Sequence, residues 1–334
     1  MSNILISLKF KGSKYEKWPL LEWTSKEVQW LLSVGAKVKR PRSIGIHDGT
    51  FHADEVTACA LLIVFGLIDQ DKVLRTRDPE RLATCEFICD VGGIYSPSAK
   101  LFDHHQASYV GELSSAGMVL DFLKTRGVIT PEEFYFYNNG LILGVDAHDN
   151  GRSPQHLGYC TFSHVIANFN PVSYEAEDGA LDAAFQEALR FAVGHIKRLY
   201  ERYLYNKECR KTVKQVMETY KVCLFFDHAI SWLESFFSLN GRNHPALFVI
   251  MPAKEHWKLR GIPPDYERRM QVRLPLPEEW AGLLGDALKK ASGIEGAVFC
   301  HKGRFTSVWE TRGDAIKALK IILKKNGVPY EDNL

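Results

Sequence analysis

The chain has 334 residues, and its charged fraction of 25% and hydrophobic fraction of 46% are typical of a globular protein. A single hydrophobic core usually stops growing below this length, so the sequence predicts two domains. The formal net charge of +2 excludes a strongly basic nucleic-acid coat protein and confines any nucleic-acid contact to a local surface. Residues 1–42 carry a charge of +6, and we interpret them as a basic N-terminal extension packed on the first domain, either a solvated linker or a binding surface.

The cysteine pattern and the absence of long apolar segments bear on the compartment of the chain. Seven cysteines occur without Cys-x-x-Cys spacing, which is typical of a reducing compartment. The N-terminus lacks the apolar segment of a secretory signal peptide, and no apolar run approaches the roughly 20 residues of a membrane helix. We therefore predict a cytoplasmic chain without a membrane partner, while the basic N-terminus leaves organelle import open. Whether the chain acts alone or as a homodimer is also left open.

From residue 43 onward, short β-rich runs alternate with helical patterns, which predicts an α/β sheet with helices on both faces. The predicted strands are 43–47, 72–77, 87–92 and 100–105, and the predicted helices are 54–66, 114–127 and 131–145. Residues 175–221 lack proline, and we expect one long helix there that joins a domain at 43–200 to a second one at 201–334. The second domain is predicted to be a smaller α/β domain with strands at 222–227, 246–251, 256–260, 271–274 and 296–301 and helices at 232–239 and 311–326.

Four groups of acidic residues and histidines fall at the ends of the predicted elements of the first domain. They are His47, His52 and Asp54; Asp90; Asp103, His104 and His105; and Asp146 with Asp149. In an α/β sheet, ligands bind beyond the carboxyl ends of the strands, where loops supply polar residues. Taken singly, the first group could be a capped helix with surface histidines, and Asp90 could be a turn residue. Four such groups together favour a metal site, because clustered ionisable residues must be paired or must bind a cation.

Four segments resemble those of the DHH phosphoesterases and, within them, of the MYG1 family in their order and spacing. They are HDGTFHADE (47–55), DVGG (90–93), DHHQ (103–106) and VDAHDNG (145–151). The resemblance covers nearly the whole chain. It implies a DHH-type catalytic domain with a parallel sheet, a long connecting helix, and a C-terminal substrate-binding domain, with the site in the cleft between the domains.

The same resemblance implies two divalent metal ions. His47, His52 and Asp90 would hold one ion; Asp54, Asp90, His104 and Asp146 would hold the other. Asp90 would then bridge the pair. A mixed set of imidazoles and carboxylates suits Mn²⁺ first and Mg²⁺ second.

Further roles are implied for residues around the metal ions. His105 would contact the scissile phosphate, while Asp103 and Asp149 would orient the ligands from behind. In the second domain, four cationic side chains would hold the substrate, unless they are merely solvated surface groups; they are Arg273, His301, Lys302 and Arg304.

The predicted function is a two-metal phosphodiester hydrolase that attacks with a metal-bridging hydroxide. The resemblance implies a 3′ to 5′ exoribonuclease or oligonucleotide nuclease, with RNA or a short oligonucleotide as substrate. One alternative is a small-molecule phosphohydrolase that acts on pyrophosphate or dinucleotides. Another is a non-catalytic metal-binding module, which an assay with added metal distinguishes from an enzyme.

Overall fold

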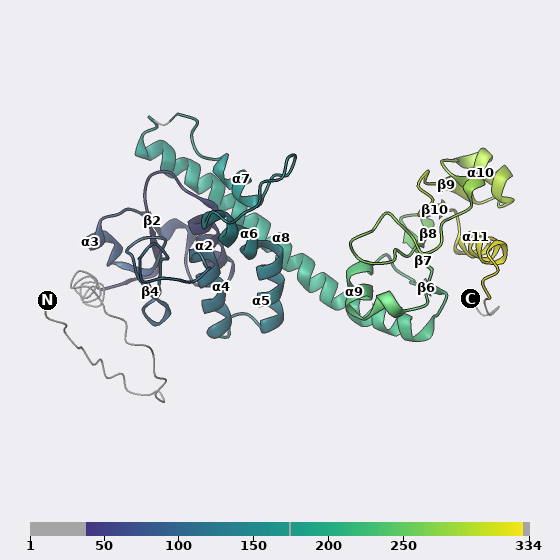
Figure 1. Cartoon of the computed structure of the whole chain (residues 1–334), viewed down its shortest axis with the longest axis horizontal. Coiled ribbons are helices and arrows are strands. Elements are labelled where there is room, and N and C mark those ends of the chain that lie inside the picture. The colour runs from purple at the N-terminus through teal and green to yellow at the C-terminus, as the bar shows by residue number, and fades with distance from the viewer. Residues whose placement is uncertain (1–37, 174, 330–334) are drawn as a thin grey trace. The chain divides into compact units, whose positions relative to one another are not determined.

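The computed structural model describes residues 38–173 and 175–329, which form two compact units divided after Leu199. Helix α8 (Asp178–Thr219) runs from the first unit into the second (Figure 1). The boundary predicted after residue 200 lies one residue from this division. Of the predicted extension 1–42, only residues 38–42 belong to the described part of the chain.

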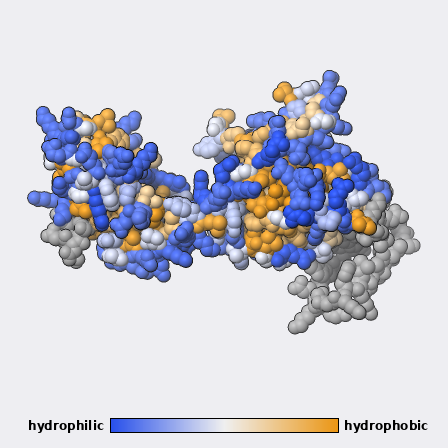
Figure 2. All heavy atoms as spheres, turned by 180° about the vertical axis from the view of Figure 1, so that it is seen from behind, coloured by the Kyte–Doolittle hydropathy of each residue, from blue (hydrophilic) through white to orange (hydrophobic). Residues whose placement is uncertain are grey.

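Hydrophilic residues cover much of the surface seen in Figure 2, and apolar residues lie among them. Within the described ranges, no helix is both long enough and apolar enough to cross a membrane.

The first unit is built on a five-stranded sheet of order β2-β1-β3-β5-β4. Its strands are β1 (Arg40–Ile46), β2 (Val73–Arg75), β3 (Cys85–Cys89), β4 (Tyr95–Ser96) and β5 (Leu101–Phe102). Every neighbouring pair is parallel except β4 with β5. The predicted α/β class with a parallel N-terminal sheet is therefore confirmed.

Helices lie on both faces of this sheet, but unequally. On one face, Phe122 of α4 (Ser115–Thr125) packs edge-on against Phe87 and Phe102, and α2 (Ala53–Val64) packs beside α4. On the other face, the short α3 (Pro79–Leu82) brings Leu82 over Gly45. A Cβ at position 45 would lie 2.7 Å from Leu82, so only glycine allows this approach.

The structure corrects several predicted boundaries in the first unit. Strand β1 begins at Arg40, three residues early, because Arg40 pairs with Cys85 of β3. The predicted helix 131–145 is divided into α5 (Pro131–Tyr137), a π-turn (Asn138–Ile142) and α6 (Leu143–Asp149). The segment from Asp146 to Asp149 is thus helical and not a turn. Helix α7 (Phe162–Ala167) was not predicted.

The second unit has its own sheet of order β6-β7-β8-β10-β9. The strands are β6 (Cys223–Phe225), β7 (Phe248–Ala253), β8 (His256–Gly261), β9 (Ala297–Cys300) and β10 (Thr306–Trp309), and the helices are α9 (Leu233–Ser238), α10 (Gly285–Ser292) and α11 (Arg312–Lys325). Four 3₁₀ turns complete the two units: Gln70–Lys72, Pro97–Ala99, Gly241–Asn243 and Glu278–Trp280.

Prediction missed β10 and α10, and the expected strand at 271–274 is not a strand. Two cores flank the sheet. Residues of α10 and α11 pack on one face, and the C-terminal part of α8 packs with α9 on part of the other.

Candidate metal centre

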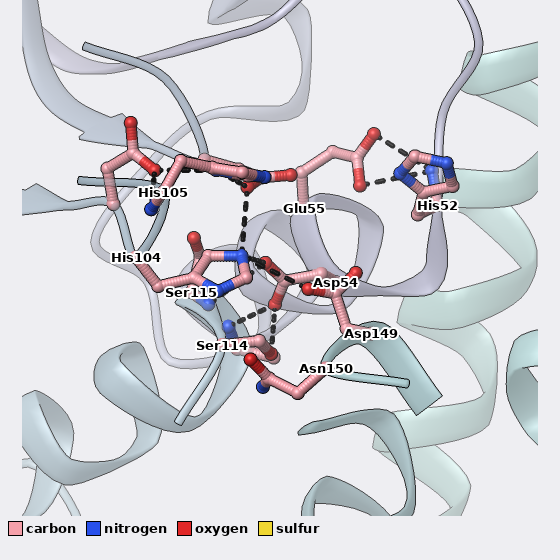
Figure 3. A network of polar contacts seen from close by, with 12 residues as sticks. His52, Asp54, Glu55, His104, His105, Ser114, Ser115, Asp149 and Asn150 are labelled. Carbon is pink, nitrogen blue, oxygen red and sulfur yellow. Dashed lines mark hydrogen bonds and ion pairs between the residues drawn. The ribbon is translucent and has the colours of Figure 1, made fainter. Parts of the chain in front are cut away.

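The predicted groups of the first unit converge beyond the carboxyl ends of β1, β3 and β5, next to α6. Figure 3 shows Asp54, His104 and Asp149 gathered there. The predicted groups surround a cleft of about 970 Å³. The predicted residues in its wall are His47, His52, Asp90, Asp103, His104, His105 and Asp149. Asp54 is fully buried and lies within reach of His104, whereas Asp146 is not part of the wall.

His47 follows the end of β1, and its Nε2 atom faces two buried carboxylates. Its Nε2 lies 3.0 Å from Glu55 Oε1 and 3.4 Å from Asp90 Oδ2, and its Nδ1 lies 2.9 Å from the carbonyl oxygen of Asp48. Burial lowers the pKa of His47, but the hydrogen bonds with Asp90 and Glu55 outweigh it and raise this pKa to about 10. The surroundings of Nε2 therefore favour a cation.

Glu55 was not predicted as a site residue. Its side chain is fully buried in the first turn of α2, where it also accepts the backbone N–H of His52 at 2.9 Å. A residue three positions after the N-cap often returns to cap the helix in this way, and that spacing was visible in the sequence. The contact with His47 was not visible, because it depends on how β1 and α2 meet.

Asp90 lies between the two sets of histidines. Besides its Oδ2 contact with His47, its Oδ1 lies 3.5 Å from His104 Nε2 and 3.4 Å from His105 Nδ1. Its backbone adopts φ 56°, a left-handed conformation, and turns directly into Gly92 and Gly93. Burial raises the pKa of Asp90, but hydrogen bonds with His104 and His47 have the larger combined effect and lower this pKa below its ordinary value. The carboxylate therefore stays charged.

Asp103 holds the loop after β5 in place. Its Oδ2 accepts the backbone N–H of Gly93 at 2.6 Å, and its Oδ1 lies 2.8 Å from His105 Nδ1. The His105 side chain is 63% exposed at the mouth of the cleft. Its hydrogen bond with Asp103 raises the pKa of His105. This geometry suits a histidine that offers Nε2 to an incoming anion.

His104 is the centre of the second set of candidate ligands. Its Nε2 lies 3.1 Å from Asp149 Oδ2 and 3.8 Å from Asp54 Oδ2. Burial lowers the pKa of His104, but hydrogen bonds with Asp149 and Asp90 raise it to about 10. Asp149, predicted only to orient ligands, therefore stands where a ligand would stand.

Asp146, predicted as a metal ligand, makes its side-chain hydrogen bonds with the start of α4. Its Oδ1 accepts the hydroxyl of Ser114 at 2.7 Å and the backbone N–H of Gly117 at 3.1 Å. A side chain at position 117 would place its Cβ 2.4 Å from Asp146 Oδ2. Asp146 thus anchors the start of α4, and it joins none of the candidate ligand groups in the described residues.

Ser114 links Asp146 to Asp54 beneath the cleft. Its hydroxyl lies 2.5 Å from Asp54 Oδ1, and Asp54 also accepts the backbone N–H groups of Ser115 at 2.9 Å and Ala116 at 2.6 Å. Burial and the charges of Asp90 and Asp149 raise the pKa of Asp54. Ser114 at the N-cap of α4 was visible in the sequence, but its partner Asp54, sixty residues away, was not.

The side chains fit a divalent metal. Three groups of described residues, the last two sharing His104, place one ligand atom of each member within 4.8 Å of the others: His47, His52 and Glu55; Asp90, His104 and His105; Asp54, His104 and Asp149. Asp90 Oδ1 and His104 Nε2 are both buried, and they lie 3.5 Å apart. Buried carboxylates at such spacing repel one another unless a cation or protons lie between them.

The four predicted substrate-binding residues lie in the second unit. Arg273 does not fit its predicted role, because its guanidinium donates to the backbone carbonyls of Gly241, His244, Ala246 and Pro263. Arg304 donates from Nε to the Leu276 carbonyl at 2.7 Å, and His301 Nδ1 accepts the Gly303 N–H at 2.9 Å. Lys302 is exposed.

A family model described as "Uncharacterised protein family (UPF0160)" and labelled MYG1_exonuc matches residues 43–323. This chain belongs to the MYG1 family. A "MYG1 protein" of Chlamydia muridarum is 56% identical over 288 residues, which cover 86% of this chain and 99% of that protein. A "MYG1 exonuclease" of Homo sapiens is 31% identical over 331 residues, covering 86% and 87%. A crystal structure of exonuclease RecJ bound to manganese covers 95% of this chain and 97% of that one, with 13% identity and a TM-score of 0.27.

Metal binding to this MYG1-family chain is expected to release at least about two protons at pH 7.5, one from each of His47 and His104. Both pKa values lie at about 10 without metal, and a metal ion needs the neutral imidazole. Titration calorimetry with MnCl₂ in buffers of different ionisation enthalpy measures this number. His104→Gln should lower it by about one, and heats that are independent of the buffer would contradict the expectation.

The same pKa values set the direction of a stability change. A folded-state pKa of about 10 against an ordinary 6.5 stabilises the metal-free fold fully below pH 6.5, and this stabilisation is lost as the pH rises toward 10. In chelator, the melting temperature should therefore fall between pH 6.5 and 9. With Mn²⁺ bound, the fall should be smaller, because the ion replaces the protons.

Proposed function

We propose that this chain is a metal-dependent phosphoesterase that degrades RNA or short oligonucleotides from the 3′ end. The observation that carries the proposal is Asp90, a buried carboxylate with His47 on one side and His104 on the other. Such a carboxylate suits a position between two metal ions. The name "MYG1 exonuclease", borne by relatives that span nearly the whole chain, supports nuclease activity.

In this proposal, His47, His52 and Glu55 would hold one divalent ion, and His104, Asp54 and Asp149 would hold a second. Asp90 would contribute its carboxylate to the same centre. We propose Mn²⁺ ahead of Mg²⁺, since imidazoles make up a large share of the donors. When bound, such ions supply positive charge at the phosphoryl group and lower the pKa of a coordinated water.

The remaining residues of the cleft position the substrate. His105, held through Nδ1 by Asp103, presents its exposed ring to a phosphate oxygen. Arg77 also lines the cleft, 3.2 Å from Asp48, and is a second cation that a phosphate can approach. Sequence reasoning missed Arg77, because a single arginine at a predicted strand end carries no specific signal.

The proposal is tested with single-stranded RNA labelled at either end and incubated with Mn²⁺ or with chelator. A 3′ to 5′ exonuclease should release the label of 3′-labelled RNA at once as a mononucleotide. It should shorten 5′-labelled RNA progressively. If the 5′ label is released first, the chain is a 5′ to 3′ exonuclease instead. Inactivity on RNA and DNA with turnover of pyrophosphate or dinucleotides would favour the small-molecule alternative, and inactivity on all of them would favour a binding module.

A further inference from the structure

The sheet of the second unit has one covered face and one face that is partly open. Along β10, Ser307 and Trp309 are fully buried, whereas Thr306 and Val308 between them are partly exposed. β10 is an inner strand of the sheet, with β8 on one side and β9 on the other. Partial exposure of every second residue on an inner strand means that little packs over that face.

The strand register identifies the side chains on the open face. Val308 lies opposite Lys258 of β8 and opposite Phe299 of β9, and Thr306 lies opposite Arg260. Directly opposed residues of an antiparallel pair share a face. Lys258, Arg260 and Phe299 therefore lie on the open face, while the core of the other face contains Leu259 and Trp309.

Helices cover this face only over the neighbouring strands. Val249 of β7 lies opposite Arg260 and packs with Val213 and Met217 of α8 and with Phe236 of α9. The apolar cover thus reaches β7. From β8 onward the face presents Lys258, Arg260 and Phe299 beside Thr306 and Val308, which makes it a surface and not an unfinished core.

The charge of the open face favours an anion. Neither Lys258 nor Arg260 has a carboxylate oxygen within 4.0 Å in the described part of the chain; Arg260 instead lies over Phe305 at 5.4 Å and donates to the Arg269 carbonyl. No strand residue assigned to this face is acidic. The second unit is also the more basic of the two. Residues 43–199 hold 11 Lys or Arg and 21 Asp or Glu, whereas residues 200–334 hold 22 Lys or Arg and 16 Asp or Glu.

Aromatic rings lie beside these cations. Phe299 and His301 are both partly exposed, with ring centroids 6.1 Å apart, and His301 lies 4.3 Å from Phe305. Cations that follow a phosphate backbone, next to rings that can stack on bases, are typical of surfaces that bind single-stranded nucleic acid. The centre of a protein interface is usually depleted in lysine, so Lys258 in the middle of the face argues against a protein partner.

We infer that the open face binds a single-stranded segment of the nucleic-acid substrate. Lys258 and Arg260 contact its phosphates, and Phe299 and His301 stack on its bases. This inference rests on the proposed function and adds a binding surface in the unit that does not contain the metal centre. It retains His301 among the predicted substrate residues and replaces Arg273 with Lys258 and Arg260.

Binding is measured by fluorescence anisotropy of labelled twelve-nucleotide RNA and DNA of the same sequence. The full chain is used in chelator, so that hydrolysis plays no part. Lys258→Glu and Phe299→Ala are each expected to weaken binding about tenfold or more, and Lys258→Glu should also reduce the dependence on salt. Lys290→Glu is the matched control, because it makes the same charge change at an exposed position on α10 and should stay within about twofold. Phe299→Tyr, which keeps a stacking ring, should retain binding.

Loss of binding in Lys258→Glu and Phe299→Ala but not in Lys290→Glu would support the inference, whether RNA, DNA or both are affected. Unchanged affinity of all variants, or an equal loss in Lys290→Glu, would overturn it, as would absence of binding by the parent chain. If Phe299→Ala does not fold, Lys258→Glu and Phe299→Tyr decide. Mn²⁺-dependent hydrolysis of a minimal phosphodiester such as bis(p-nitrophenyl) phosphate tests the metal centre separately. If the parent chain does not hydrolyse this substrate, the proposed function is contradicted, and the binding result is unaffected.

Discussion

Replacing Asp90 with asparagine is expected to lower Mn²⁺-dependent hydrolysis by about 10³-fold, because the side chain that lies between both sets of ligands loses its charge. Loss of metal-based charge stabilisation is worth several kcal/mol, and each 1.4 kcal/mol is a factor of ten in rate. Asparagine tolerates the left-handed backbone at this position, so the fold should persist. Hydrolysis rates and metal stoichiometry, the latter from calorimetry, check both parts.

The matched control is Asp48→Asn. This substitution makes the same change of charge in the same cleft. Asp48, however, is half-exposed and pairs with Arg77 instead of a candidate ligand. Its hydrolysis rate should stay within about threefold, as expected for an exposed ion pair. A comparable loss in both variants would mean that general negative charge matters, and not the position of Asp90.

Asp149→Ala and Asp146→Ala are expected to fail in different ways, because the structure gives the two carboxylates different partners. Asp149 faces His104 at 3.1 Å in the cleft, so its removal should lower hydrolysis by at least about 100-fold. Asp146 accepts hydrogen bonds from Ser114 and Gly117, so its removal should cost about 2–4 kcal/mol of unfolding free energy.

Urea unfolding in chelator and hydrolysis rates measured well below the melting temperature separate these effects. If Asp146→Ala is as stable as the wild type but no longer binds metal, Asp146 is a metal ligand, as the family resemblance implied. Wild-type activity of Asp149→Ala would remove Asp149 from the ligand set. His148→Ala, on the same helix between them, is a control for damage to α6.

Elements with a strong local pattern were predictable. Helix α2 consists largely of an apolar run that follows a capping signal. The buried runs that became β1 and β3 each end next to a polar group. Helix α7 and strand β10 were missed because each is six residues or shorter, and so short a segment gives little periodicity. The expected strand around Arg273 was wrong: the backbone N–H of Arg273 donates to the Ile262 carbonyl, but its guanidinium makes most of the connections to the rest of the unit.

The sequence by itself determined the α/β class, the long helix, and which histidines and acids gather at the strand ends, because these follow from local periodicity and from polar residues after apolar runs. Only the tertiary structure decided the partner of each carboxylate. Asp146 and Asp149 are three residues apart on one helix, yet one faces the N-terminus of α4 and the other faces His104. Glu55 likewise meets His47 only because β1 and α2 close around the loop between them. Such contacts depend on the direction in which each side chain leaves its element, and spacing along the chain does not specify this direction.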